Sequence, residues 1–189
     1  MSTTDTATQL LDTAQTLIQT RGYNAYSYND LAEAVGIKTA SVHYHFPSKA
    51  DLGVAVMARY RAQLAASLER IDTATTGCEP KLRQFIDIYR TAESCGTMCL
   101  CGSLAHDLDT LPDEVRAEVN SYIEASTRWI CRTIEAGIEQ EGLTTSCSPS
   151  DMAATLVGSL QGSLLVSRAG GGGHLVDAVE RVFLVTLTG

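Results

Sequence analysis

Several features that would indicate a membrane protein or an enzyme are missing from this sequence. No stretch of the 189 residues approaches the ~18 consecutive apolar residues of a membrane-spanning helix. Residues 1–10 are polar and lack the basic region and apolar run of a signal peptide. There is also no Cys-x-x-Cys motif, no Ser, His and Asp arrangement and no phosphate-binding glycine loop. We therefore expect a cytoplasmic protein with no membrane partner and no cofactor, and a thiol-dependent enzyme is only a distant alternative.

Positive charge is also scarce. The chain has 14 Lys and Arg against 22 Asp and Glu, which gives a formal net charge of −8. Because nonspecific nucleic-acid binding is driven by neutralising phosphates, this balance argues against a protein that coats nucleic acid. The acidic excess lies in residues 61–189, which hold ten basic and seventeen acidic residues. Between Ala34 and Ala50 the only charged residues are Lys38 and Lys49, so that segment is locally positive.

No strand pattern and no internal repeat stand out, whereas apolar residues recur at helical spacing along most of the chain. One such stripe covers residues 6–21. A second continues for about six turns from Leu52 to Ile71 and predicts a long helix. Further helices are expected after Pro80, Pro112 and Ser148. The sequence therefore predicts an all-α fold of about nine helices.

The segment Ser27–Leu52 has the pattern of a helix-turn-helix. Ser27 and Asp30 form a predicted capping box, and Gly36 can take the left-handed conformation that ends the first helix. Thr39 can then cap a second short helix, which Pro47 terminates. Polar residues of such a helix contact DNA in the major groove, and a plain surface hairpin is the alternative. The exposed polar set is predicted to be Lys38, Thr39, Ser41, His43, Tyr44 and His45, while Ala40, Val42 and Phe46 can face the partner helix or a base methyl group.

The segment from about Ala7 to Tyr60 resembles the TetR-type transcriptional regulators. The resemblance rests on Arg21-Gly22-Tyr23, on Leu31-Ala32 with Val35-Gly36-Ile37, and most specifically on residues 41–49, SVHYHFPSK. It implies that Tyr44, Lys49 and Ser27 hold DNA phosphates. It also implies that the groove is faced by Lys38, Thr39, Ser41, His43 and His45. The predicted domains are a DNA-binding domain at residues 1–48 and an effector-sensing and dimerisation domain at residues 49–189, connected by the long helix.

The last two predicted helices are too apolar to form a lone surface hairpin, so a second copy of the chain is expected to cover them. In TetR-like proteins the corresponding pair forms a four-helix dimer interface, and a dimer can place two recognition helices in successive major grooves. The expected DNA partner is therefore a palindromic operator. The residues predicted to form the homodimer interface are Leu156, Leu160, Leu164, Val179 and Phe183.

The same resemblance implies a cavity for a small-molecule effector among the middle helices. An ordinary place in the core is the alternative for each aromatic residue that could line it. The candidate lining residues are Tyr60, Phe85, Tyr89, His106, Tyr122 and Trp129.

Three of the six cysteines, Cys95, Cys99 and Cys101, lie within seven residues of one another. They are expected to be reactive sensor thiols, because two of them lie at a predicted helix N-terminus, which favours the thiolate. Two alternatives are buried structural cysteines and a soft-metal site completed by Met98 or His106. No metal site is adopted, since the Cys-x3-Cys-x-Cys spacing is not that of a zinc site.

The segment GTMCLCGSLAHDLDTLPDEVRAEV resembles an electrophile- and oxidant-responsive branch of the TetR family related to NemR and AcuR. On that match Cys101 is the sensor cysteine. The sequence departs from this branch in two places. Cys101 is followed by Gly102, and the segment LQGSLLVSRA lacks the lysine that, in that branch, partners the sensor cysteine. Cys99 or Cys95 would then be the partner. The predicted protein is a repressor released by an electrophile or oxidant, with a reversible apolar ligand or a soft metal as the alternative effector.

Overall fold

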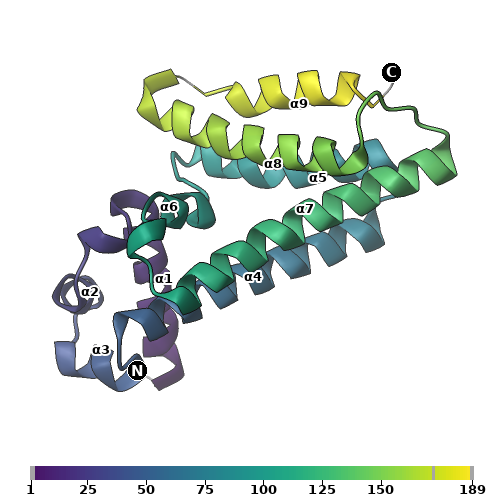
Figure 1. Cartoon of the computed structure of the whole chain (residues 1–189). Coiled ribbons are helices and arrows are strands. Elements are labelled where there is room, and N and C mark those ends of the chain that lie inside the picture. The colour runs from purple at the N-terminus through teal and green to yellow at the C-terminus, as the bar shows by residue number, and fades with distance from the viewer. Residues whose placement is uncertain (1–2, 172, 188–189) are drawn as a thin grey trace. The chain divides into compact units, whose positions relative to one another are not determined.

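The computed structural model describes residues 3–171 and 173–187, and the regular secondary structure of that part of the chain is all helical (Figure 1). The described residues form nine α-helices, as predicted, and none of these helices is long and apolar enough to cross a membrane. The helices are α1 (Thr3–Arg21), α2 (Tyr28–Val35), α3 (Thr39–His45), α4 (Lys49–Ala74), α5 (Cys78–Ser94), α6 (Leu100–His106), α7 (Asp113–Glu141), α8 (Pro149–Val166) and α9 (Leu175–Val185). Three shorter helical turns are η1 (Tyr23–Ala25), η2 (Leu108–Thr110) and η3 (Ser167–Gly171).

The chain divides into two compact units. The first contains the described residues up to Gln63 together with Leu100–Ser121, and the second contains Leu64–Cys99 and the described residues from Tyr122 onward. Helices α4 and α7 each run through both units. This division differs from the boundary expected at residue 48, because α6 and the start of α7 group with the first three helices.

The first unit packs α1, α2, α3 and the start of α4 around a shared apolar core. Its buried side chains include Leu10, Ile18, Leu31, Val42 and Leu52, all at most 1% exposed. Each helix contributes through one apolar stripe, which is what amphipathic spacing requires. Burial of this core holds the short helices, since a helix of seven or eight residues is not stable in water by itself.

The second unit contains α5, α8 and α9 and the adjoining parts of α4 and α7. Ser148 caps α8 by accepting a hydrogen bond from the Asp151 N–H, as the sequence predicts. An aromatic cluster lies in this unit, where the Phe85 ring stacks on Trp129 at a centroid distance of 5.6 Å and contacts Tyr89 at 5.7 Å. All three rings are buried.

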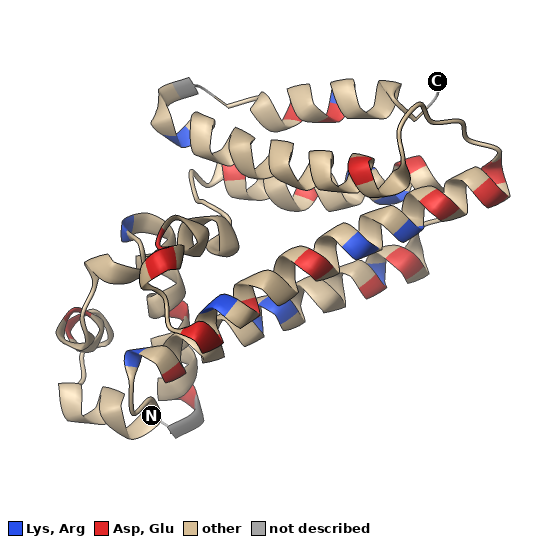
Figure 2. Cartoon of the chain, viewed as in Figure 1, with Lys and Arg blue, Asp and Glu red and all other residues tan. Residues whose placement is uncertain are grey.

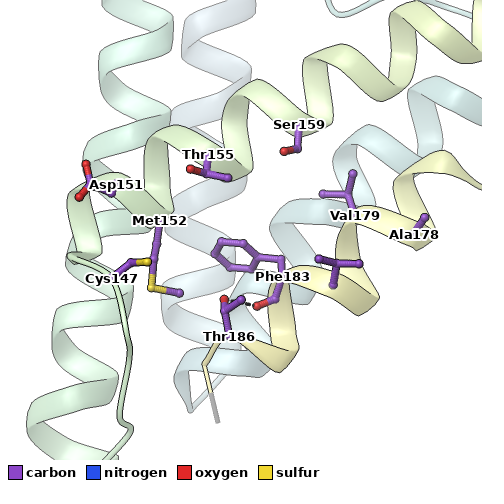
Figure 3. A pocket seen from close by; sticks show the side chains of 10 residues that line it. Cys147, Asp151, Met152, Thr155, Ser159, Ala178, Val179, Phe183 and Thr186 are labelled. Carbon is purple, nitrogen blue, oxygen red and sulfur yellow. Dashed lines mark hydrogen bonds between the residues drawn. The ribbon is translucent and has the colours of Figure 1, made fainter. Parts of the chain in front are cut away.

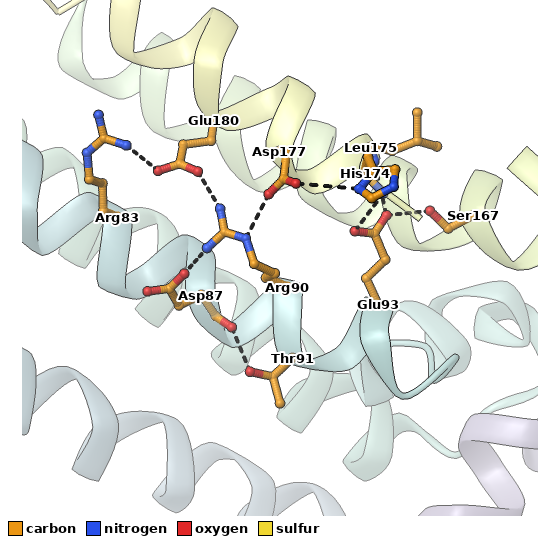
Figure 4. Close-up of polar contacts among 10 residues, drawn as sticks. All are labelled: Arg83, Asp87, Arg90, Thr91, Glu93, Ser167, His174, Leu175, Asp177 and Glu180. Atoms are coloured by element: carbon orange, nitrogen blue, oxygen red, sulfur yellow. Dashed lines mark hydrogen bonds and ion pairs between the residues drawn. The ribbon is translucent and has the colours of Figure 1, made fainter. Parts of the chain in front are cut away.

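A polar seam joins α5 to α9 (Figure 4). The Glu180 carboxylate, only 14% exposed, bridges the guanidinium groups of Arg83 and Arg90. Arg90 also contacts Asp177 at 2.8 Å and pairs with Asp87 on its own helix. Hydrogen bonds to Glu79 and Glu180 raise the pKa of Arg83, and contacts with Asp177 and Glu180 raise the pKa of Arg90. The Arg90 hydrogen bond lowers the pKa of Asp177. The seam therefore fixes where α9 lies along α5.

Candidate DNA-binding site

The helix-turn-helix is held at both ends of α2. The Ser27 hydroxyl accepts the Asp30 N–H at 3.3 Å, and the Asp30 carboxylate accepts the Ser27 N–H at 2.7 Å. This confirms the capping box. Gly36 closes α2 at φ 76°, ψ 34°, and the Ile37 N–H donates to the Ala32 carbonyl at 2.9 Å. Gly36 has no Cβ to strain in this left-handed region, so the turn brings α3 back across α2.

Helix α3 itself carries no Lys, Arg, Asp or Glu (Figure 2). Its most exposed large side chain is Tyr44, which is 78% exposed and makes an edge-to-face contact with His45. Lys38, at the N-cap, and His43 are also exposed, while Ser41 is half-buried. The helix therefore offers hydroxyl, imidazole and phenol groups with one lysine at its N-terminal end, which suits a surface that reads base edges.

The structure corrects two predictions about α3. Val42 is 0% exposed, so of its two predicted positions it takes the buried one and has no surface to offer a base. Thr39 does not cap α3. The N-cap is Lys38, with no side-chain cap bond, and the Thr39 hydroxyl donates instead to the Asn29 side-chain oxygen at 2.8 Å. Ala40 is exposed, so it is the small residue of α3 that a thymine methyl group can reach.

Ser27 and His43 have part of their polar capacity occupied within the protein. The Ser27 hydroxyl is engaged with Asp30 in the capping box, whose hydrogen bonds lower the pKa of Asp30. The His43 Nδ1 lies 3.2 Å from the Pro47 carbonyl oxygen, and the His43 ring contacts Tyr28. A ring that donates from Nδ1 presents Nε2 as its remaining polar atom.

Lys49, expected to hold a phosphate, points into its own unit. Its ammonium donates to the Tyr26 carbonyl at 2.5 Å and lies over the Tyr26 and Tyr23 rings, 4.1 and 4.9 Å from their centroids. Burial lowers the pKa of the Lys49 ammonium, against the opposing effect of the Asp107 and Asp30 carboxylates. Lys49 is therefore already coordinated by the protein in this conformation.

Sequence reasoning missed two contributors to this surface. Asn29 is exposed on α2, and its side-chain oxygen accepts a hydrogen bond from the Thr39 hydroxyl. The amide N–H groups of Asn29 take no part in that hydrogen bond. The Tyr28 hydroxyl contacts the Phe46 carbonyl at 3.0 Å and the Ser48 carbonyl at 2.5 Å, and so ties α2 to the turn after α3. Nothing in the local pattern predicts either contact, since the partners are 10 to 20 residues away in the chain.

The residues predicted to line an effector cavity belong to both units. Phe85, Tyr89 and Trp129 form the buried cluster of the second unit, and the Trp129 indole donates to Asp72 at 2.9 Å. Tyr122 is buried in the same unit. Tyr60 is half-buried in the first unit, and His106 is exposed there, so His106 is not a buried lining residue.

The three clustered cysteines have different environments. Cys95 is exposed just after α5, whereas Cys99 and Cys101 are 3% and 1% exposed. Burial therefore shields Cys101, the expected sensor, from direct attack in this conformation. Within residues 3–171 and 173–187, no three His, Cys, Asp or Glu side chains are placed to hold a metal ion. Burial raises the pKa of the Cys78 thiol to about 11. The pKa of the Cys131 thiol is also raised, first by burial and then by Glu135.

The predicted dimer residues lie mostly inside the protomer. Leu156 and Leu160 are 0% exposed and Leu164 is 2% exposed, because they pack under α8 against α5 and α9. Phe183 is 7% exposed and Val179 is half-buried. The exposed large apolar residues of the α8–α9 hairpin are others, namely Leu165, Val166, Val182 and Val185, which are 50 to 71% exposed.

A shallow hollow of about 400 Å³ lies along this hairpin (Figure 3). Met152 and Phe183 line it from the two helices, with Val179 and Val182 beside them and Cys147 at one end. Helix α8 has one charged residue, Asp151, and one side-chain amide, Gln161, and its other residues are apolar or small. The side of the hairpin that lines the hollow is therefore a weakly polar surface of the second unit.

A short helix with exposed polar groups that follows another short helix across a Gly turn is the arrangement of a helix-turn-helix DNA-binding protein. Residues 10–56 match the family model described as "Bacterial regulatory proteins, tetR family", and residues 78–183 match "Tetracyclin repressor-like, C-terminal domain". The chain belongs to the TetR family of bacterial regulatory proteins. It is a DNA-binding transcriptional regulator and not an enzyme.

Solved structures and a curated relative support this assignment. A TetR-family regulator from Agrobacterium tumefaciens is 30% identical, with a TM-score of 0.94 and 100% coverage of both chains. A TetR regulator from Legionella pneumophila is 33% identical, with a TM-score of 0.85 and 95% coverage of both chains. The HTH-type transcriptional repressor DhaR from Mycobacterium sp. (strain GP1) is 25% identical over 87% of this chain and 83% of its own length. Reduced NemR from E. coli shares the fold, with a TM-score of 0.83 over 96% of this chain and 97% of its own, at 19% identity.

Proposed function

We propose that this regulator is a homodimeric repressor that binds a palindromic operator through α3. The observation that carries the proposal is the exposed, polar and locally charge-poor face of α3, with Lys38 at its N-terminal end and Tyr44 projecting from it. Repression is supported by DhaR, a repressor alignable over 87% of this chain. A dimer is supported by the exposed valines of α9, which would otherwise remain in water.

The cations available to DNA on the first unit are few. Among its described residues, Arg59, Arg61 and Arg116 form ion pairs with Asp12, Glu118 and Asp113, and Lys49 points inward. Arg21 and Lys38 remain as its exposed cations outside those contacts. A dimer then presents about four such charges, so the logarithm of operator affinity should fall with the logarithm of salt concentration with a slope of about −4.

Replacing Lys38 with alanine tests this surface. Because each dimer loses two cations, the salt slope should become shallower by about 2, and affinity in low salt should fall. The measurement is operator binding by fluorescence anisotropy across a salt series. A slope equal to that of the wild type would contradict a contact between Lys38 and the DNA.

For the effector, we propose a thiol-reactive electrophile or oxidant acting on the segment from Cys95 to Cys101. The exposed Cys95 is the group that a reagent in solution meets first, and the buried Cys99 and Cys101 follow it within six residues. Cys78 and Cys131 are poorer nucleophiles, since their raised pKa values lower the thiolate fraction. Cys147 is exposed but belongs to the α8–α9 face.

N-ethylmaleimide provides a direct test. The thiolate adds across the maleimide double bond, forming a carbon–sulfur bond while the adjacent carbon takes a proton from water. One equivalent should release the operator from the wild type and from Cys147→Ser, but not from Cys95→Ser, as followed by gel shift and intact mass. If Cys95→Ser is released like the wild type, Cys95 is not the reactive site. Inducer response in a cysteine-free variant would instead favour a reversible apolar ligand.

A further inference from the structure

The first turn of α2 is held against α3 at two points. Both helices belong to the first unit, where they lie side by side (Figure 1). The Tyr28 hydroxyl contacts the carbonyls of Phe46 and Ser48, just beyond the end of α3, at 3.0 and 2.5 Å. One residue later, the Asn29 side-chain oxygen accepts a hydrogen bond from the Thr39 hydroxyl at 2.8 Å. Because Thr39 is the first residue of α3, contacts at both ends of that helix fix the position of Asn29.

Among the side chains of residues 27–30, Asn29 has polar groups left over. Ser27 and Asp30 are engaged with each other in the capping box. An asparagine amide carries two N–H donors and an oxygen with two lone pairs. Thr39 takes one of those lone pairs, and among the described residues no acceptor is placed to take either N–H. Since Asn29 is exposed, two donors and one lone pair remain available at the N-terminal end of α3.

The location and the chemistry of this amide favour contact with a base over contact with a phosphate. The N-terminal residues of a recognition helix lie at base edges in the major groove, and the amide is bonded to the first of them. In that groove adenine presents an acceptor, N7, beside a donor, the N6 amino group, which is the pattern that an asparagine amide matches. A phosphate oxygen offers an acceptor only, so the remaining lone pair of the amide oxygen would have no partner.

We propose that Asn29, which lies on α2 and outside the recognition helix, reads one adenine in each half-site. Its amide donates to N7 of the base, and its oxygen accepts from the N6 amino group. Thr39 is a positioning residue, because its hydroxyl bonds the amide oxygen and so fixes which edge of the amide carries the donors. The inference rests on the proposed function, since it requires an operator that α3 recognises.

Selection from a random duplex library, with the full-length reduced protein, tests the role of the amide. Asn29→Asp keeps an acceptor for Thr39 and puts a carboxylate in the first turn of a helix, which the helix dipole favours, but the carboxylate has no N–H to donate. This variant should lose the adenine preference at one position of each half-site and keep the other preferences. Asn24→Asp is the matched control and should keep them all, because it makes the same change at an exposed asparagine that bonds Thr110 instead.

Variants of Thr39 test the positioning role separately. Thr39→Val removes the hydroxyl with little change of shape and should weaken the adenine preference. Thr39→Ser keeps the hydroxyl and should restore the preference. Equal preferences in the valine and serine variants would contradict a role for the hydroxyl in orienting Asn29.

Replacing the selected adenine with 7-deazaadenine tests the contact at one atom. Because the analogue lacks the N7 acceptor, it should weaken binding by the wild type about tenfold, and binding by Asn29→Asp by no more than about twofold, as measured by anisotropy. If Asn29→Asp instead binds all sequences more weakly and keeps the adenine preference, the amide contacts a phosphate and the inference is overturned. A wild type that enriches no sequence would overturn the proposed function as well, whereas enriched half-sites that are identical in both proteins would overturn this inference alone.

Discussion

A chain carrying Val182→Glu and Val185→Glu should be a monomer and should bind a palindromic operator at least 100-fold more weakly than the wild type. Both valines are 71% exposed in the protomer, and Val182 lines the hollow of the α8–α9 hairpin together with Met152 and Phe183. If these residues lie in the dimer interface, the substitution buries four carboxylates per dimer without partners, which costs several kcal/mol each. Loss of the second half-site contact then removes the ~10² to 10⁴ that bivalent binding contributes.

Sedimentation equilibrium and operator anisotropy on the same samples measure both parts of this expectation. Since both positions are exposed, the helical content of the protomer should be retained. Ile123→Glu is a matched control, because Ile123 is a large apolar residue, 36% exposed, that lies on α7 and outside the hairpin. A double variant that remains dimeric would place the interface elsewhere.

Replacing Lys49 with alanine should destabilise the first unit by about 2 kcal/mol and reduce operator binding without making the salt slope shallower. A charge-assisted hydrogen bond contributes about 1.5–3 kcal/mol and a cation–π contact about 0.5–1. We expect the lower end of the combined range, because the Lys49 side chain is only half-buried. The two lysines of the segment are thus expected to have different roles: we propose that Lys38 contacts DNA, whereas Lys49 holds the Tyr26 carbonyl.

Urea unfolding of the two alanine variants separates these roles. Lys49→Ala should lower the free energy of unfolding, and Lys38→Ala should leave it within about 0.5 kcal/mol, as is usual for a surface substitution. A Lys49→Ala protein of wild-type stability whose salt slope becomes shallower would show that Lys49 leaves Tyr26 and binds a phosphate, as the family resemblance implies.

Much of the fold follows from local sequence signals. Ser27 with Asp30, Gly36 and Ser148 specify caps whose hydrogen bonds and dihedral angles the structure reproduces, because capping depends on residues within one turn. The helical stripes predict nine helices for the same reason. The resemblance at residues 41–49 identifies the recognition helix, and the exposure of Tyr44 agrees with a role at the DNA surface.

The direction of individual side chains was not predictable in the same way. Periodicity places Val42 and Leu160 on an apolar stripe but does not say whether the same chain or a second copy covers it. Both are fully buried within the protomer. Lys49 is turned inward by a carbonyl 23 residues earlier, and Asp107 holds an N–H 84 residues away. Such pairs depend on tertiary packing, which no local pattern encodes.

The central claim is that two copies of the chain read a palindrome through residues 38–48. Selection of duplexes from a random library by the wild-type protein, under reducing conditions and without effector, tests it most directly. We predict enrichment of two inverted half-sites, with the Val182→Glu and Val185→Glu double variant failing to enrich them and Lys38→Ala enriching them more weakly. Equal recovery of all sequences by the wild-type protein would contradict the claim.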